Sequence, residues 1–203
     1  MSALFSAQTT KKSEVSIMPF ETTGDEYVSC KYEVGDIGSG GGYVFYRSET
    51  GFSVHSGENV IICHYLECSP DVVSDGVTWC PCNGSYCNLD TSNAIGAGKK
   101  NTEKIICADH SGEALSAHNC AAKACAEYST KTTKAGDWYL PSEVELYLVY
   151  KNLVKTGVIN NGGGFWSSSQ NSNFIAYGQR FSGGFQVNGG KYCSHRVLAV
   201  HAF

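Results

Sequence analysis

"GDWYLPSEVELYLVY", from Gly136 to Tyr150, is the stretch that most sharply predicts the fold of this chain. Ser142 precedes Glu145 by three residues, which is the capping-box signature of a helix N-terminus. Beyond it, apolar residues recur at helical spacing on one face: Leu146, Val149 and Leu153. The stretch therefore predicts a helix that begins at Ser142 and packs one apolar side against the rest of the protein.

Strands are predicted on both sides of this helix. Upstream, residues 32–56 read as strand, glycine turn, strand, turn, strand, and residues 58–70 add another apolar run. Downstream, residues 174–203 predict three short strands separated at Gly183-Gly184 and Gly189-Gly190. The final run "RVLAVHAF" lacks two-residue alternation, which favours a central strand covered on both faces.

Helices are predicted before residue 136 as well, in "NTEKIICADH" and "SGEALSAHNCAAKACAEYS". The segment 71–98 is rich in Gly, Asn, Asp and Cys and predicts a long irregular loop. With 23 glycines and only four prolines in 203 residues, the chain favours many turns and short strands. We expect an α+β fold.

The chain is long enough for one substantial core, so we expect a single domain over residues 25–203. Residues 1–24 are rich in Ser, Thr and Lys and read as a flexible leader or tether. No run of about 18 apolar residues exists, so no membrane span is predicted.

Ten cysteines in a chain of this size permit disulfides and hint at export, but their spacing does not give a connectivity. The run "CPCNGSYC" has C-x-C and C-x4-C spacings rather than the paired C-x2-C of structural zinc. We therefore expect no metal site, and buried free thiols and local disulfides both stay open.

Charge is distributed unevenly along the chain. The net charge is −4, yet no Asp or Glu follows Glu145, while five Lys and Arg residues do. The C-terminal part therefore cannot supply a pair of catalytic carboxylates or an oxygen cage for calcium.

Three separated motifs, "YEVGDIGSGGGYVFY", "GDWYLPSEVELYLVY" and "GFWSSSQ…RVLAVHAF", carry a resemblance when they are taken together. Their order and spacing resemble a bacterial group of surface and secreted domains with a C-type-lectin-like fold of the formylglycine-generating-enzyme subtype, over about residues 28–203. That resemblance implies two main helices packed on short, mostly antiparallel strands with long irregular loops. More narrowly, residues 170–203 resemble the variable region of proteins diversified by a retroelement, of the treponemal variable protein type.

In such proteins, template-directed mutagenesis at adenines turns Asn codons into a restricted residue set that lacks Trp, Gln, Lys, Met and Glu. The resemblance implies a fixed frame in this chain: Gln170, Ala176, Gln179, Phe181, Ser182, Gly184, Gln186, Lys191, Arg196, Val197, Ala199, Val200, Ala202 and Phe203. The residues between them all belong to the permitted set. Those expected to bind a ligand are Ser172, Asn173, Phe174, Ile175, Tyr177, Gly178, Arg180, Phe185, Val187, Gly189, Tyr192, Cys193, Ser194, His195, Leu198 and His201.

The function implied is ligand binding without catalysis, with the variable residues exposed on a stable frame. We expect the ligand to be an unknown macromolecule, a protein or glycan on another cell or phage, with no cofactor and no nucleic acid. We also expect a monomer exported to a bacterial cell surface, with the leader as a candidate lipid anchor.

Three other functions were weighed. Formylglycine-generating enzymes resemble this chain in fold but use paired C-terminal cysteines, whereas only Cys193 lies in this region, so no catalytic residue is assigned. Calcium-dependent lectins carry Glu-Pro-Asn or Gln-Pro-Asp and Trp-Asn-Asp motifs that are absent from this sequence. An invariant structural domain of an envelope protein is the remaining alternative.

Single residues have simpler predicted roles. Trp138 and Trp166 are expected to anchor the core, and Asp137 to fix a turn. His195, which lies among the variable residues, is expected to be exposed.

Overall fold

The computed structural model describes residues 31–80, 88–110, 113–114 and 119–203. The leader expected over residues 1–24 lies outside the described residues. In chain order the elements are β1 (Tyr43–Ser56), β2 (Asn59–Cys68), β3 (Ser74–Thr78), α1 (Gly98–Cys107), β4 (Asp109–His110), β5 (Glu113–Ala114), α2 (Ala121–Glu127), α3 (Glu143–Val149), the π-helical turn η2 (Tyr150–Val154), β6 (Gly164–Gln170), β7 (Ile175–Arg180), β8 (Phe185–Gly190), β9 (Ser194–Val197) and β10 (Val200–Ala202).

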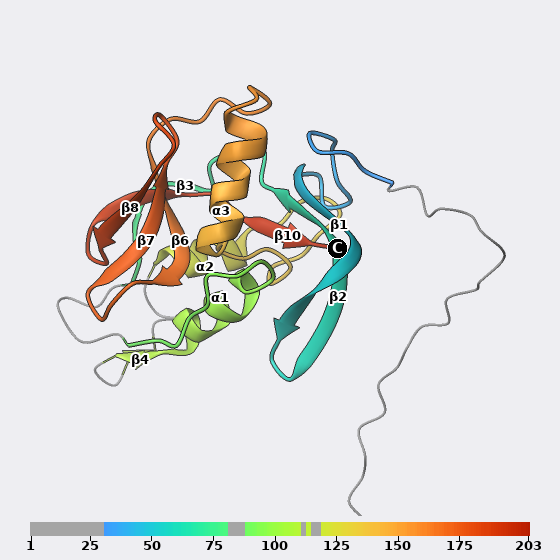
Figure 1. The fold of residues 1–203 in the computed structure, drawn as a ribbon. Helices are drawn as coiled ribbons and strands as arrows, with labels where there is room; N and C mark the ends of the chain where they lie inside the picture. The colour runs from blue at the N-terminus through green and yellow to red at the C-terminus, as the bar shows by residue number, and fades with distance from the viewer. Residues whose placement is uncertain (1–30, 81–87, 111–112, 115–118) are drawn as a thin grey trace, which may run out of the picture.

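The strands form a three-stranded sheet of order β1-β2-β10, a five-stranded sheet of order β3-β9-β6-β7-β8, and the small pair β4-β5. Pairing is antiparallel except for a parallel bridge between β6 and β9 at Phe165 and Arg196. Helix α3 lies between the two larger sheets (Figure 1), and its buried residues share one apolar cluster with residues of both. The expected α+β class is confirmed.

Helix α3 begins where the sequence predicts. The Ser142 hydroxyl accepts a hydrogen bond from the Glu145 N–H at 3.3 Å, and the Glu145 carboxylate accepts one from the Ser142 N–H at 2.7 Å. This reciprocal pair is the capping box. Leu146, Val149 and Leu153 are buried as expected, although the last of these lies in the π-helical turn that continues α3.

Glu145 also binds a segment far away in the sequence. Its other carboxylate oxygen accepts a hydrogen bond from the Gly96 N–H at 2.8 Å, and a Cβ on Gly98 would lie 2.4 Å from the carboxylate. The side chain is fully buried, so the N-terminus of α3, the end of the long loop and the start of α1 meet on one carboxylate.

A second buried carboxylate, Glu67 on β2, organises the glycine-rich loop before β1. It accepts hydrogen bonds from the N–H groups of Gly40 and Gly42, both at 2.7 Å. A Cβ at Gly40 would lie 2.4 Å from this carboxylate, which explains why the loop needs glycine here. The His201 Nδ1 lies 2.7 Å from the same carboxylate. His201 is therefore bonded to the scaffold, with a side chain only 16% exposed, and its role in ligand binding stays a prediction.

Several strand boundaries differ from the sequence-based prediction. The turn expected near Gly51 is an irregularity within one long strand, because β1 and β2 shift register between Arg47 and Phe52 and then continue to pair. The turn at Gly183-Gly184 is confirmed, with Gly184 at φ 74°, whereas Gly189-Gly190 lies inside β8. The expected turn therefore falls at residues 191–193 instead.

The run "RVLAVHAF" is not one central strand. Its first part ends β9 in the five-stranded sheet, and its second part is β10, paired with β2 in the other sheet. Leu198 and Ala199 connect the two and are fully buried. The run is apolar without alternation because it passes between sheets, which sequence periodicity cannot distinguish from a covered strand.

The helical predictions hold in part. Helix α1 is confirmed for the first part of "NTEKIICADH", although it begins earlier, at Gly98, and Asp109–His110 is the strand β4. Helix α2 covers only the second half of the longer predicted segment, and Glu113–Ala114 is the strand β5. Helix α2 is a third helix where two main helices were expected. No helix in the described part of the chain is long and apolar enough to cross a membrane.

The core contains all three tryptophans, Trp79, Trp138 and Trp166, each fully buried. Their indole N–H groups donate to the Ser167 carbonyl, the Thr133 hydroxyl and the Val77 carbonyl respectively. The predicted core roles of Trp138 and Trp166 are confirmed. So is the turn role of Asp137, whose carboxylate accepts from the Lys134 N–H at 2.9 Å.

Cysteines occur in both states within the described residues. Cys80 is disulfide-bonded. Free thiols occur at Cys63, Cys68, Cys107, Cys120, Cys125 and Cys193. Burial raises the pKa of the Cys125 thiol well above its ordinary value, so this sulfur is unreactive. Free thiols and a disulfide-bonded cysteine are therefore both present among the described residues.

We predict that Glu145 makes stability fall as the pH rises toward neutrality. Burial raises its pKa from 4.5 to about 7, against the opposing effect of the N–H groups that bond it. Because the folded state holds this proton more tightly than the unfolded chain, the stabilisation is present below about pH 4.5 and is lost as the pH rises through 7.

Urea unfolding at pH 5 and pH 8 measures this effect. Wild type should lose more stability over that interval than Glu145→Gln, which cannot titrate, whereas Glu49→Gln at an exposed position should follow wild type. Equal losses in wild type and Glu145→Gln would contradict the assignment.

Candidate ligand-binding face

One face of the β7–β8 hairpin gathers several of the predicted variable residues. Arg180 pairs with Phe185, and Gly178 pairs with Val187, so these four residues share a face because paired residues and residues two apart point to the same side. Trp166 on β6 pairs with Gly178 and lies on this face too. We call Arg180, Phe185, Val187 and His195 the hairpin face.

Trp166 and His195 form the base of the hairpin face. Their ring centroids are 4.3 Å apart in an edge-on arrangement. A Cβ on Gly189 would lie 2.6 Å from the Trp166 ring and 3.1 Å from His195 Nε2, so all three residues meet. The indole itself is buried, and its edge supports the residues above it.

His195 is only half-buried rather than fully exposed as predicted. Its burial, and then the positive charge of Arg180, lower the pKa of His195. The imidazole is therefore neutral at physiological pH, and Arg180 supplies the positive charge of the hairpin face. A guanidinium group and an exposed aromatic side chain are both common at contact surfaces.

Two exposed aromatic residues lie in the loops next to the hairpin. Phe174 is 48% exposed and Tyr192 is 71% exposed, while Phe185 on the hairpin face is 68% exposed. The Lys191 N–H donates to the Phe174 carbonyl at 2.9 Å, so the loop before β7 and the loop after β8 lie side by side. Large aromatic side chains this exposed are uncommon in a folded domain and are typical of contact surfaces.

Other predicted residues do not join the hairpin face. Ile175 and Tyr177 alternate with its members along β7 and point to the opposite side of the sheet. Ser172 and Ser194 are exposed, and Asn173 and the free thiol Cys193 are partly buried, in or beside the loops that hold Phe174 and Tyr192. The predicted set therefore covers two sides of the hairpin rather than one.

Three predicted ligand-binding residues are built into the scaffold. Leu198 is fully buried where the chain passes between the sheets, so it cannot contact a ligand. Gly178 is buried, and a Cβ there would lie 2.6 Å from the Phe165 carbonyl oxygen, which excludes larger residues without a backbone shift. Gly189 has the contact with Trp166 described above. The close contacts of these positions leave little room for larger side chains.

Many residues of the predicted frame are buried, but some are exposed. Ala176, Gln179, Phe181, Lys191 and Val197 are buried, as a fixed frame requires. Ser182, in the turn between β7 and β8, and Gln186, on the edge strand β8, are exposed. Gln186 and the neighbouring exposed Asn188 are surface residues that the prediction missed, and edge position is not visible in a single sequence.

Comparison with models of known protein families finds no match, and comparison with curated proteins finds no significant relative.

We predict that the hairpin surface and its base differ sharply in their effect on stability. Phe185→Ser and Tyr192→Ser remove exposed rings, so each should change the free energy of unfolding by no more than about 0.5 kcal/mol. Trp166→Ala empties a fully buried site and should cost about 3–5 kcal/mol. Chemical denaturation of the three variants measures this, and similar losses in all three would show that the hairpin surface is part of the core.

We predict a matched difference between two glycines. Gly178→Ala places a methyl group against the Phe165 backbone and should destabilise the protein by about 1–3 kcal/mol. Gly162→Ala meets nothing within 4 Å and should be close to neutral or slightly stabilising. Thermal unfolding separates the two outcomes, and a neutral Gly178→Ala would restore this position to the replaceable set.

Proposed function

We propose that this chain is a non-enzymatic ligand-binding protein that recognises a macromolecule, protein or glycan, through the hairpin face and the adjoining loops. The observation that carries the proposal is the exposure of large aromatic side chains at both ends of the hairpin: Phe185 lies opposite Arg180 at the turn, and Phe174 and Tyr192 lie in the loops at the other end. Tyr, Phe and Arg are the residue types that contribute most to binding energy in protein interfaces. Here they lie on an edge hairpin whose base is held by a buried tryptophan.

The separation between the buried base of the hairpin and its exposed surface supports the proposal that a retroelement diversifies this region. The base is fixed by buried contacts of Trp166, Ala176 and Val197, none of which belongs to the exposed set. Exposed side chains above such a base can change with little effect on folding. A retroelement-diversified region on a C-type-lectin-like scaffold, as the sequence motifs imply, needs this property.

The proposed location follows from the same reading, and one observation agrees with it. Cys80 is disulfide-bonded, and disulfides persist in oxidising compartments such as the cell exterior. We therefore propose an exported protein displayed on a bacterial surface. Catalysis of the formylglycine-generating type is not proposed, because that chemistry needs paired cysteines and the C-terminal region contains only Cys193.

An invariant structural domain is the competing function. It draws support from Gly178, Leu198 and His201, which lie in the implied variable set and yet serve the scaffold. The two functions differ in how many substitutions the hairpin face should tolerate without unfolding. They also differ in whether such substitutions should produce binding to new ligands.

We predict that random substitution of the hairpin residues produces new binding without loss of folding, which a display library measures. Residues 174, 180, 185, 187, 192 and 195 would be randomised together and sorted for binding to streptavidin. A second library of equal size would randomise six exposed positions away from the hairpin: Arg47, Glu49, Lys131, Lys134, Lys151 and Lys155. Binders should arise from the hairpin library with folding retained, because its positions lie on the hairpin and its adjoining loops, outside the buried cluster that holds the base.

Two outcomes would overturn the proposal. One is a hairpin library in which most members fail to fold, and the other is a yield of binders no greater than that of the second library. The coding DNA gives an independent check of diversification: a near-copy of the segment for residues 170–203, differing mainly at adenines, should lie beside a reverse-transcriptase gene.

A further inference from the structure

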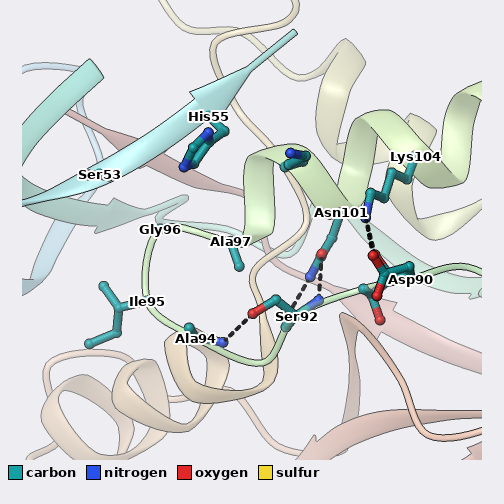
Figure 2. Close-up of a pocket in the computed structure, with 12 residues that line it drawn as sticks. Ser53, His55, Asp90, Ser92, Ala94, Ile95, Gly96, Ala97, Asn101 and Lys104 are labelled. Carbon is teal, nitrogen blue, oxygen red and sulfur yellow. Dashed lines mark hydrogen bonds and ion pairs between the residues drawn. The ribbon is translucent and has the colours of Figure 1, made fainter. Parts of the chain in front are cut away.

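A cleft on another part of the molecule is unrelated to the hairpin face. It has a volume of about 440 Å³ and is formed by β1, the loop before α1, and α1 itself. Figure 2 shows His55 on the β1 side, and Lys104 and Asn101 on the α1 side. Pockets of this size accommodate small molecules rather than protein surfaces.

The loop wall of the cleft is fixed in place by the core. The Asn101 amide accepts from the Ser92 N–H at 2.9 Å and donates to the Ser92 carbonyl at 2.7 Å. The Ser142 hydroxyl donates to the Ala94 carbonyl at 2.8 Å, and Glu145 holds Gly96 as described above. The cleft is therefore preformed, so a ligand would not have to order the loop in order to bind.

Gly96 also sets the shape of the cleft. It has φ 83°, and a Cβ there would lie 2.1 Å from the Ser53 carbonyl oxygen. Only glycine allows the loop to approach β1 this closely. The loop and β1 therefore close one end of the cleft.

The charges that line the cleft are unbalanced. Lys104 is paired with Asp90 through both the carboxylate, at 3.4 Å, and the backbone carbonyl. Lys100 and His55 line the same cleft, and among the described residues neither has a hydrogen-bond or ion-pair partner. The first turn of α1 contains Lys99 and Lys100 and no acidic residue. The cleft thus offers Lys100 and His55, which have no partner in the described part of the chain, beside Lys104 and Asp90, which are paired with each other.

We propose that this cleft binds a small molecule through an anionic oxygen group, a carboxylate or a phosphate, with Lys100 as the main charge contact and His55 beside it. The Thr91 hydroxyl accepts from the Gln170 N–H at 2.8 Å and retains its own proton to donate to such a group. A polyanion does not fit, because the chain has a net charge of −4 and Glu58, an exposed residue, lies near the end of β1.

A titration of the whole chain with inorganic phosphate and, separately, with acetate tests the proposal. Backbone amide shifts would be followed by NMR at constant ionic strength, so that general screening does not change. We expect saturable shifts at Thr91 and Lys100 with at least one of the two anions, and which anion binds more tightly distinguishes a phosphate from a carboxylate ligand. Shifts that grow linearly without saturation for both anions would overturn the proposal.

Two substitutions should change the affinity for the anion in opposite directions. Lys100→Gln removes the unpaired charge and should weaken binding by about tenfold, the usual loss for one charge-assisted contact. Asp90→Asn removes the carboxylate that pairs with Lys104 and should tighten binding by severalfold. Lys151→Gln, which removes an equal charge far from the cleft, should bind as wild type does.

The readouts keep this inference separate from the proposed function. A Phe185→Ser Tyr192→Ser variant should bind the anion normally even if it no longer binds a macromolecule. Equal weakening by Lys100→Gln and Lys151→Gln would show only general charge attraction. A folded Lys100→Gln variant that binds like wild type, or glucose binding in place of both anions, would refute the assignment of an anion site.

Discussion

The buried carboxylate of Glu145 is the constraint on which the arrangement of the helices depends. A carboxylate in the protein interior is costly unless hydrogen bonds replace its water shell. Here Ser142 and Gly96 supply backbone N–H groups at 2.7 and 2.8 Å, and a Cβ at Gly98 would collide with the same group. The N-terminus of α3, the loop wall of the cleft and the start of α1 are therefore positioned together. Removing this one acceptor would leave buried donors unsatisfied in segments far apart in the sequence.

Glu67 plays the same part for the three-stranded sheet. It binds the glycine loop before β1 and lies against His201 on the C-terminal strand, so residues 27 and 134 positions away in sequence meet on it. Both carboxylates bind glycines whose missing side chains leave room for the oxygen atoms. Long irregular segments can be rigid in this fold because each is held by an acceptor that belongs to a regular element. That rigidity is what makes a preformed cleft and a stable hairpin base possible.

The capping box was a reliable local signal, whereas the glycine turns expected near Gly51 and at Gly189-Gly190 were not found, and long-range contacts were not predictable. The capping box at Ser142 and Glu145 was predictable because both partners lie within four residues. The bond from Gly96 to the same Glu145 spans 49 residues, and no periodicity indicates it. The burial of Trp138 and Trp166 followed from their size alone. By contrast, "RVLAVHAF" was misread because an apolar run that passes between two sheets has the same pattern as a strand covered on both faces.

The candidate site shows the same division between local and long-range information. The sequence pattern predicted that Phe185, Tyr192 and Arg180, which lie between frame positions, would be exposed, and they are. It could not show that Gly178 faces the Phe165 carbonyl or that His201 lies against Glu67, because both contacts depend on pairing between distant strands. A residue type permitted by a mutational code is not thereby permitted by the fold. If the region is diversified as proposed, the surface free to vary is smaller than the sequence pattern implies: it is the part of the edge hairpin above Trp166, where neither a neighbouring backbone nor a buried carboxylate restricts the side chain.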